Sequence, residues 1–323
     1  MKQDRREFIK KAGWTFIGSG LYINLFTLDK ALASSTCTGI RNLYAFIVNT
    51  ETCIGCGNCV AACRTENNVP PDNYRTWVER YTILNSGDVE VDDPNGGEKG
   101  FDPAPFKKAD IQKSFFVPKL CNHCTKPACV AACPRQAVYK REEDGIVLVD
   151  QNRCRGYRYC VKGCPYKKVY FNTEEKLSQK CIFCYPRLEK NPVEQNFCFT
   201  QCVGRIRYVG YNTNAQANVN KLVDDWKVAM LLFPEFGTEP NLYYIPPMSP
   251  PQSNGTERVP TDYLADLFGD NKDQKHKARK ARIEEIFNIL ETERAKVAAG
   301  GTSELIDILI AKSEDDRLQL NLG

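Results

Sequence analysis

Cysteine spacing is the strongest chemical signal in this sequence. The chain has 323 residues and 16 cysteines but only 2 histidines, so thiolates are the metal ligands it can offer. Two residues between cysteines form a tight loop whose thiolates converge on one cuboidal cluster and whose N–H groups point at the cluster sulfides. Four motifs of this kind predict iron–sulfur clusters. They hold fifteen cysteines: Cys53, Cys56, Cys59, Cys63; Cys121, Cys124, Cys129, Cys133; Cys154, Cys160, Cys164; and Cys181, Cys184, Cys198, Cys202.

The motifs repeat, and so do the elements expected around them. The run Cys59-Val-Ala-Ala-Cys63 recurs as Cys129-Val-Ala-Ala-Cys133, and its alanines favour a helix. The last cysteine of such a run points away and ligates the other cluster in two-cluster ferredoxins. An apolar, strand-like segment precedes each motif, at 43–48, 114–117, 146–149 and 169–171. Strands at 138–140 and 146–149 flank Asp144-Gly145, a hairpin signal. The predicted fold is α+β, a duplicated two-[4Fe–4S] ferredoxin-like fold.

The third motif lacks one cysteine. Tyr157 stands where the spacing requires the second ligand, so this cluster has only three thiolates. Loss of a corner ligand favours loss of one iron, which predicts one [3Fe–4S] cluster beside three [4Fe–4S] clusters. Positive charge around the motif would stabilise its reduced state, although some of these groups are solvated surface charges: Arg153, Arg155, Arg158 and Lys162. The alternative is a [4Fe–4S] cluster completed by water, hydroxide or the Tyr157 phenol.

Other uses of these cysteines fit the spacing less well. Structural zinc uses separated C-x2-C pairs, and disulfide frameworks suit small secreted domains. His123 lies inside the second motif, but the cysteines already fill the cluster, so we expect it beside the ligands or on the surface. Cys37 lies outside every motif and is expected to be free.

The N-terminus has the pattern of an export signal. Arg5-Arg6 precedes Phe8-Ile9-Lys10 and resembles a twin-arginine signal; an apolar run follows, and residues 31–33 read Ala-Leu-Ala, a cleavage pattern. We expect residues 1–33 to be removed and the chain to be exported folded, to the periplasm or another extracytoplasmic space. This route suits clusters that are built before export. An uncleaved membrane anchor is the alternative, but the run of 17 residues is short for a span.

Charge and composition exclude other classes of protein. The formal charge is +4, of which residues 1–33 contribute +3 through six Lys or Arg and three acids. Four oxidised clusters with their thiolates would add roughly −8, so the loaded protein should be mildly acidic and should not bind nucleic acid. With 42% hydrophobic residues, the chain is neither disordered nor a multi-span membrane protein, and no span is expected in the mature chain.

The remaining segments define the domain boundaries. Residues 34–250 are expected to form the four-cluster domain, with 64–113 as a polar inserted surface that could meet a partner and a turn at 92–97. Residues 251–323 are expected to form a helical extension. Its apolar stripe at i, i+3, i+4 and i+7 should dock on this chain or on a partner: Ile283, Ile286, Phe287 and Leu290.

Three features of the sequence resemble one known family. The second motif with its following Pro134, the bulky Tyr157, and the Pro- and Tyr-rich stretch 233–247 are similar to the iron–sulfur β subunits of the type II dimethyl sulfoxide reductase family. That group includes the β subunits of nitrate, selenate and chlorate reductases, dimethyl sulfide dehydrogenase and ethylbenzene dehydrogenase. Periplasmic members usually carry no signal of their own, so the signal predicted here is a departure.

The resemblance implies how the motifs share clusters. By this resemblance, each of the first three sets of cysteines below would bind a [4Fe–4S] cluster, and the last set would bind the [3Fe–4S] cluster. The sets are Cys53, Cys56, Cys59, Cys202; Cys63, Cys181, Cys184, Cys198; Cys121, Cys124, Cys129, Cys164; and Cys133, Cys154, Cys160. It also implies a molybdenum bis-pterin catalytic α subunit nearest the first cluster. A haem b γ subunit, or a cytochrome c, would lie nearest the last.

Electron transfer without substrate chemistry is the function predicted. The sequence has no Rossmann glycine loop, P-loop or catalytic His/Asp set. A structural or assembly protein held by its clusters is one alternative. A ferredoxin-like subunit of a cytochrome- or quinol-linked complex without molybdenum is another.

Overall fold

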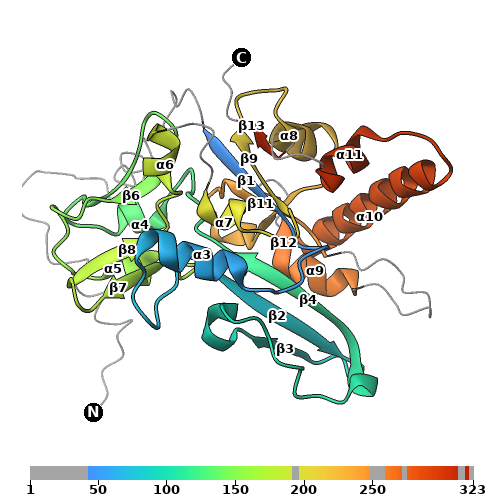
Figure 1. Ribbon diagram of the computed structural model, residues 1–323, viewed down its shortest axis with the longest axis horizontal. Helices are drawn as coiled ribbons and strands as arrows, with labels where there is room; N and C mark the ends of the chain where they lie inside the picture. The colour runs from blue at the N-terminus through green and yellow to red at the C-terminus, as the bar shows by residue number, and fades with distance from the viewer. Residues whose placement is uncertain (1–42, 191–195, 248–258, 271–274, 312–316, 320–323) are drawn as a thin grey trace, which may run out of the picture. The chain divides into compact units, whose positions relative to one another are not determined.

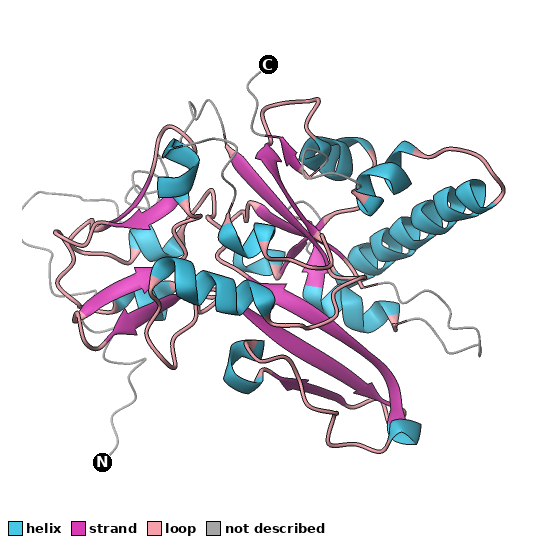
Figure 2. Cartoon of the chain, in the orientation of Figure 1, coloured by secondary structure: helices cyan, strands magenta, loops and turns pink. Residues whose placement is uncertain are grey.

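Strands and short helices alternate through the described part of the chain. The computed structural model describes residues 43–190, 196–247, 259–270, 275–311 and 317–319. Figures 1 and 2 show the mixture of elements that the α+β class requires. The predicted signal at 1–33 and Cys37 lie outside the described residues.

A six-stranded sheet lies at the centre of the described chain. β1 (Tyr44–Asn49) pairs antiparallel with β9 (Arg207–Tyr211) and parallel with β11 (Leu242–Ile245). All six residues of β1 are buried, and the apolar run from Tyr44 to Val48 suits this position at the centre of the sheet. The strand order is β12-β10-β11-β1-β9-β13, and the outer strands are β10 (Met230–Leu232), β12 (Phe268–Gly269) and β13 (Leu318–Gln319).

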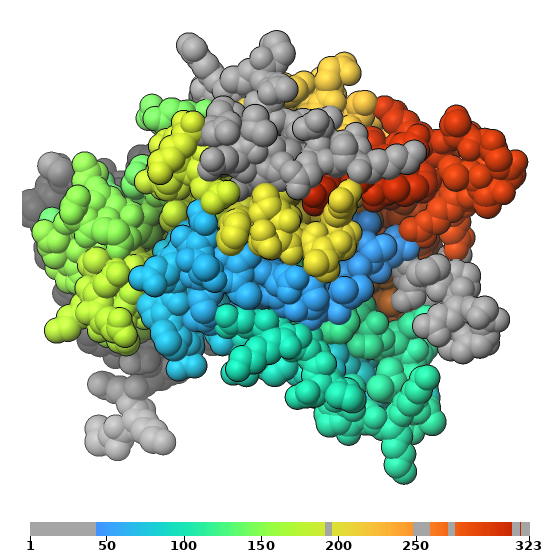
Figure 3. Space-filling model, in the orientation of Figure 1, coloured from blue at the N-terminus to red at the C-terminus, as the bar shows by residue number. Residues whose placement is uncertain are grey.

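The inserted segment folds as part of a second sheet. β2 (Trp77–Leu84) lies between β3 (Val89–Asp92) and β4 (Ile111–Lys119), both antiparallel to it. Short 3-10 turns, η1 (Pro94–Gly97) and η2 (Lys108–Asp110), connect β3 to β4. The segment is not only surface, because it places Val78, Tyr81 and Ile83 in the main core. It is the teal part of the surface in Figure 3.

Two antiparallel ribbons flank the cysteine motifs. β5 (Val138–Lys140) pairs with β6 (Val147–Val149), which confirms the predicted hairpin. β7 (Val169–Asn172) pairs with β8 (Leu177–Lys180). The polar sequence of β8, Leu-Ser-Gln-Lys, gave no strand signal, and its pairing with β7 makes it a strand directly before the fourth motif.

Short helices follow the cysteine loops in pairs. α3 (Asn58–Asn67) packs on α7 (Phe197–Thr200), and α4 (Ala128–Ala131) packs on α5 (Tyr159–Gly163). α6 (Tyr185–Lys190) follows the first two cysteines of the fourth motif. Helices from motifs far apart in sequence therefore lie side by side.

The C-terminal region docks on the central sheet. It contains α9 (Thr261–Leu267), α10 (His276–Ala298) and α11 (Glu304–Ile310). Three short turns of helix precede it: α8 (Asn218–Asn220), the π-helical turn η3 (Lys221–Asp225) and the 3-10 turn η4 (Pro234–Phe236). The predicted stripe lies on α10, and all four side chains are buried within this chain: Ile283, Ile286, Phe287 and Leu290. β12 and β13 join the sheet, so the region is not purely helical. None of the described helices combines the length and apolar character of a membrane span.

The described residues form two hydrophobic cores of very different size. The large core joins the central sheet, the second sheet and the C-terminal helices. The small core contains only five buried residues: Cys129, Val138, Val147, Cys160 and Val169. β6 alternates between the two, since Val147 faces the small core and Leu148 the large one. The part of the chain around the second and third motifs therefore has little apolar support of its own.

Candidate iron–sulfur sites

Four cavities in the described chain are lined by cysteines, and each draws on more than one motif. Their volumes are about 350, 470, 360 and 300 Å³, in the order used below. The lining cysteines of the first to fourth cavities are Cys53, Cys56, Cys59, Cys202; Cys63, Cys121, Cys181, Cys184, Cys198; Cys121, Cys124, Cys129, Cys164; and Cys133, Cys154, Cys160. All fifteen motif cysteines thus line a cavity.

The last cysteine of each motif lines a different cavity from the one before it. Cys59 and Cys63 lie about one turn apart on α3, yet they line the first and second cavities respectively. The other motifs repeat this four-residue offset. The pairs are Cys129 and Cys133, Cys160 and Cys164, and Cys198 and Cys202.

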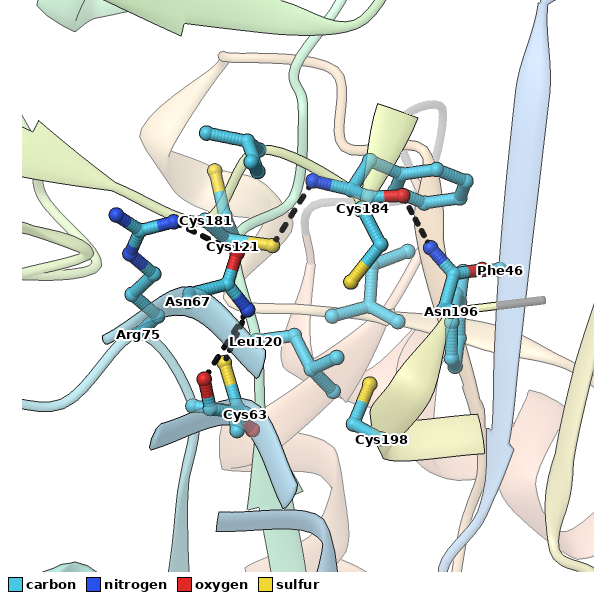
Figure 4. A pocket seen from close by; sticks show the side chains of 14 residues that line it. Phe46, Cys63, Asn67, Arg75, Leu120, Cys121, Cys181, Cys184, Asn196 and Cys198 are labelled. Atoms are coloured by element: carbon cyan, nitrogen blue, oxygen red, sulfur yellow. Dashed lines mark hydrogen bonds between the residues drawn. The ribbon is translucent and has the colours of Figure 1, made fainter. Parts of the chain in front are cut away.

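The second cavity gathers thiols from the first and the fourth motif, together with Cys121 of the second (Figure 4). Burial raises the pKa of the Cys63 thiol well above its usual range, and the nearby thiols of Cys181, Cys198 and Cys184 raise it further. Asn67 on α3 donates its amide to Cys63 Sγ at 3.7 Å. The backbone N–H of Phe183 donates to Cys181 Sγ at 3.4 Å. The site therefore already supplies hydrogen bonds to its sulfur ligands.

One backbone feature recurs in all four cysteine loops. The second residue after the first cysteine has a positive φ: 67° at Gly55, 40° at His123, 67° at Gly156 and 57° at Phe183. A left-handed residue at this point turns the chain so that successive N–H groups face the inside of the loop, where they bind anions. Sequence reasoning did not find this feature at His123 and Phe183, because a positive φ is uncommon for any residue other than glycine.

His123 is buried rather than on the surface. It is 6% exposed and lines the third cavity, and its Nδ1 accepts a hydrogen bond from Val147 N at 3.0 Å. Burial lowers the pKa of His123 well below its usual range, so the ring is neutral and Nε2 carries the hydrogen. Within the described chain, Nε2 has no hydrogen-bond partner. The surface alternative for this residue was wrong.

Burial disfavours ionisation of these thiols. Desolvation raises the pKa of Cys53, Cys124 and Cys129 to about 12, and that of Cys181 to about 11. Such groups become thiolates at neutral pH only when a metal displaces the proton. Among the described residues, no three His, Cys, Asp or Glu side chains are grouped as a single metal ion requires. Sulfur atoms around a cavity suit a polynuclear cluster better than one zinc ion.

A buried arginine fits an anionic group between the first two cavities. Arg207 on β9 is 0% exposed and lines the first cavity. Its Nη1 donates to Cys198 Sγ at 3.7 Å, whereas Nε and Nη2 have no partner in the described chain. A buried charge without a counter-ion is strongly destabilising. An iron–sulfur cluster with its thiolates carries the negative charge that this guanidinium requires.

Tyr157 occupies the backbone position of a cysteine ligand. The preceding Gly156 has the same φ as Gly55, 67°, and a Cβ at Gly156 would lie 2.6 Å from Lys176 O. The following Arg158 has φ 63°, close to the 75° of Gly57. The loop of the third motif therefore has the conformation of the first, and Tyr157 corresponds to Cys56.

The surroundings of Tyr157 differ in part from those predicted. Arg155 and Arg158 line the fourth cavity, as does Arg135, which sequence reasoning missed. Arg153 instead pairs with Asp150 at 3.3 Å. Outside the cavity, an open groove is lined by four residues, of which the two tyrosines are more than half exposed: Ala132, Pro134, Tyr157 and Tyr159.

Comparison with known proteins agrees with this geometry. A family model described as a 4Fe-4S dicluster domain matches residues 112–212, and one described as a 4Fe-4S binding domain matches residues 46–66. The dimethylsulfide dehydrogenase subunit beta of Rhodovulum sulfidophilum is 36% identical over 87% of this chain and 100% of its own length. The respiratory nitrate reductase subunit beta of Haloferax mediterranei is 39% identical, over 84% and 91%. The chlorate reductase subunit beta of Ideonella dechloratans is 49% identical, over 63% and 61%.

The fold, the cysteine loops and these relatives define an iron–sulfur electron-transfer protein that uses [4Fe–4S] clusters. The chain belongs to the β subunits of the dimethyl sulfoxide reductase family.

Proposed function

We propose that this chain relays electrons through four clusters, one in each cavity. The first three cavities hold [4Fe–4S] clusters and the fourth holds a [3Fe–4S] cluster. The observation that carries the proposal is the grouping of all fifteen motif cysteines around four cavities. Cys121 lines both the second and the third cavity; its C-x2-C loop with Cys124 assigns it to the third.

The fourth cavity supports the smaller cluster. It is lined by only three cysteines, Cys133, Cys154 and Cys160, whereas each of the other three cavities has at least four. Tyr157 stands at the position of the fourth ligand. Its side chain is 58% exposed and also lines the groove outside the cavity. A phenol that faces the groove would cover the iron-free corner rather than bind a fourth iron.

The proposed clusters lie in two ferredoxin-like halves. The first and second cavities are built on α3 and α7, from the first and fourth motifs. The third and fourth are built on α4 and α5, from the second and third motifs. In each half, two helices pack on each other. The last cysteine of each motif lines the other cavity of the same half. This arrangement supports a duplicated two-cluster fold.

We propose two redox partners, one for each end of the series. The relatives named above are β subunits of a dehydrogenase and of reductases, so the partner on the first-cavity side is a molybdenum bis-pterin catalytic α subunit. Exposed apolar side chains, Ile54 at 65% and Val203 at 61%, adjoin Cys53 and Cys202 and suit a protein interface. A haem b γ subunit or a cytochrome c would bind beside Tyr157 and Tyr159.

Redox titration of the purified complex, monitored by electron paramagnetic resonance, tests this function. We expect about 15 irons per chain, a [3Fe–4S] signal in the oxidised protein and three [4Fe–4S] signals that appear on reduction. Clusters that never change oxidation state at accessible potentials would point to a structural or assembly role. Absence of molybdenum from the purified complex would favour a cytochrome- or quinol-linked subunit.

Export by the twin-arginine route gives a separate prediction. Replacing Arg5 and Arg6 by lysine should hold most of the cluster-loaded precursor in the cytoplasm, because recognition requires the arginine pair. Immunoblots and iron analysis of cell fractions measure this, with Lys10→Arg and Lys11→Arg as the matched control. Undiminished export of the paired-lysine variant would indicate a Sec signal or transport on another subunit.

A further inference from the structure

Two buried cations lie between neighbouring cavities. Arg207 lines the first cavity and donates to Cys198 Sγ in the second, at 3.7 Å. Lys180, at the end of β8, is 2% exposed and lines the third cavity. Its Nζ donates to Cys181 O at 2.7 Å, and Cys181 lines the second cavity. Each cation therefore contacts the ligand sets of two cavities.

Cysteine sulfurs are the electrostatic partners of these cations. Arg207 lines the first cavity together with Cys53, Cys59 and Cys202, and its Nη1 donates to Cys198 Sγ in the second. Its Nε and Nη2 have no hydrogen-bond partner among the described residues. The charge of Arg207 is thus divided between two ligand sets.

Lys180 has the same relation to the next pair of cavities. Lys180 lines the third cavity together with Cys124 and Cys129, and its Nζ donates to the carbonyl oxygen of Cys181, a residue of the second cavity. Its Nζ is held in place by the carbonyl oxygens of Val147 and Cys181. Neither cation can move towards solvent without breaking these contacts.

A buried charge acts strongly on a redox centre beside it. Reduction adds one electron to a cluster, and a fixed cation stabilises that electron, which raises the reduction potential. Solvent screens the effect at the surface but much less in the interior. A cation between two clusters raises both potentials together.

We propose that Arg207 and Lys180 are potential-setting residues, each shared by two neighbouring clusters. Arg207 serves the first and second clusters, and Lys180 serves the second and third. The inference rests on the proposed four-cluster function and adds residues that are not iron ligands.

Arg207→Met and Lys180→Met in the purified complex test this inference. Redox titration of Arg207→Met should lower two of the three [4Fe–4S] potentials, each by about 59 mV or more, which is a tenfold shift in the reduction equilibrium. Lys180→Met should also lower two of the three [4Fe–4S] potentials. One cluster should be affected by both substitutions. The [3Fe–4S] potential should stay unchanged in both variants.

Arg205→Met is the matched control. Arg205 lies two residues before Arg207 and carries the same charge, but its side chain is exposed. Its potentials should match those of the wild type. Iron content is measured for every variant, and Arg207→Gln replaces Arg207→Met if that variant loses iron. Unchanged potentials in both cation variants, or an equal shift of all four clusters, would overturn the inference. A wild type without four reducible clusters would instead refute the proposed function.

Discussion

Removal of the iron should unfold residues 121–181 before it unfolds the rest of the described chain. We expect the amide hydrogens of β5, β6, β7 and β8 to lose most of their protection from exchange. Those of β1, β9 and β11 should keep much of theirs. The difference follows from the unequal cores of the two parts.

The small core cannot hold its segment without metal. Three of its five buried members are valines: Val138, Val147 and Val169. The other two members of this core are Cys129 and Cys160, which are themselves proposed ligands. In small metal-bound domains the free energy of metal binding is largely the free energy of folding.

The large core has other sources of stability. It contains β1, whose six residues are all buried, and the fully buried α10 side chains Ile283, Ile286 and Leu290. Loss of the clusters in the first and second cavities would still leave Arg207 buried without its counter-charge, which costs several kcal/mol. That penalty weakens this part but does not remove its apolar packing.

Hydrogen exchange followed by mass spectrometry, before and after anaerobic chelation of the iron, measures the effect. A thiol reductant keeps the freed cysteines from forming disulfides. Cys59→Ser, which removes a ligand of the first cavity only, should leave the protection of residues 121–181 unchanged. Equal loss of protection in both parts after chelation would contradict the prediction.

The cysteine loops and the α+β class could be predicted from the sequence because each is visible in short local patterns. A thiolate loop is local, so C-x2-C runs, the Val-Ala-Ala repeat and the turn at Asp144-Gly145 are all visible within a few residues. The stripe on α10 was visible for the same reason, since its period of 3.6 residues depends on nothing outside the helix.

The buried cations could not be predicted, because burial depends on distant segments. Arg205 and Arg207 are indistinguishable in the run Gly-Arg-Ile-Arg-Tyr, yet the first is exposed and the second is 0% exposed. Only the pairing of β9 with β1 turns Arg207 inward, opposite Val48. β8 was missed for a related reason: its Lys180 is buried by β6 and by the cysteine loop rather than by any apolar pattern of its own.

Replacing Tyr157 by cysteine should convert the [3Fe–4S] cluster into a [4Fe–4S] cluster. The backbone already has the required form, since Gly156 and Arg158 match the φ angles of Gly55 and Gly57. The new thiolate would stand where Cys56 stands in the first motif and could hold a fourth iron. We expect about 16 irons per chain instead of about 15. The [3Fe–4S] electron paramagnetic resonance signal of the oxidised protein should be lost.

The same substitution should slow electron flow at the Tyr157 end of the series. An added thiolate raises the negative charge of the cluster and lowers its potential. Each lowering of about 59 mV makes electron transfer to that cluster tenfold less favourable. Turnover with the physiological partner should fall, whereas the chemistry of the catalytic subunit, assayed with artificial dyes, should survive.

Tyr159→Cys is the matched control for this change. Tyr159 is 57% exposed against 58% for Tyr157, and both line the outer groove, but Tyr159 is the first residue of α5 and does not correspond to a ligand position. That variant should keep the [3Fe–4S] signal, the iron content and the potential of the wild type. If the oxidised wild type gives no [3Fe–4S] signal and contains four [4Fe–4S] clusters, then water, hydroxide or the Tyr157 phenol completes the site. In that case there is no iron-free corner for Tyr157 to cover.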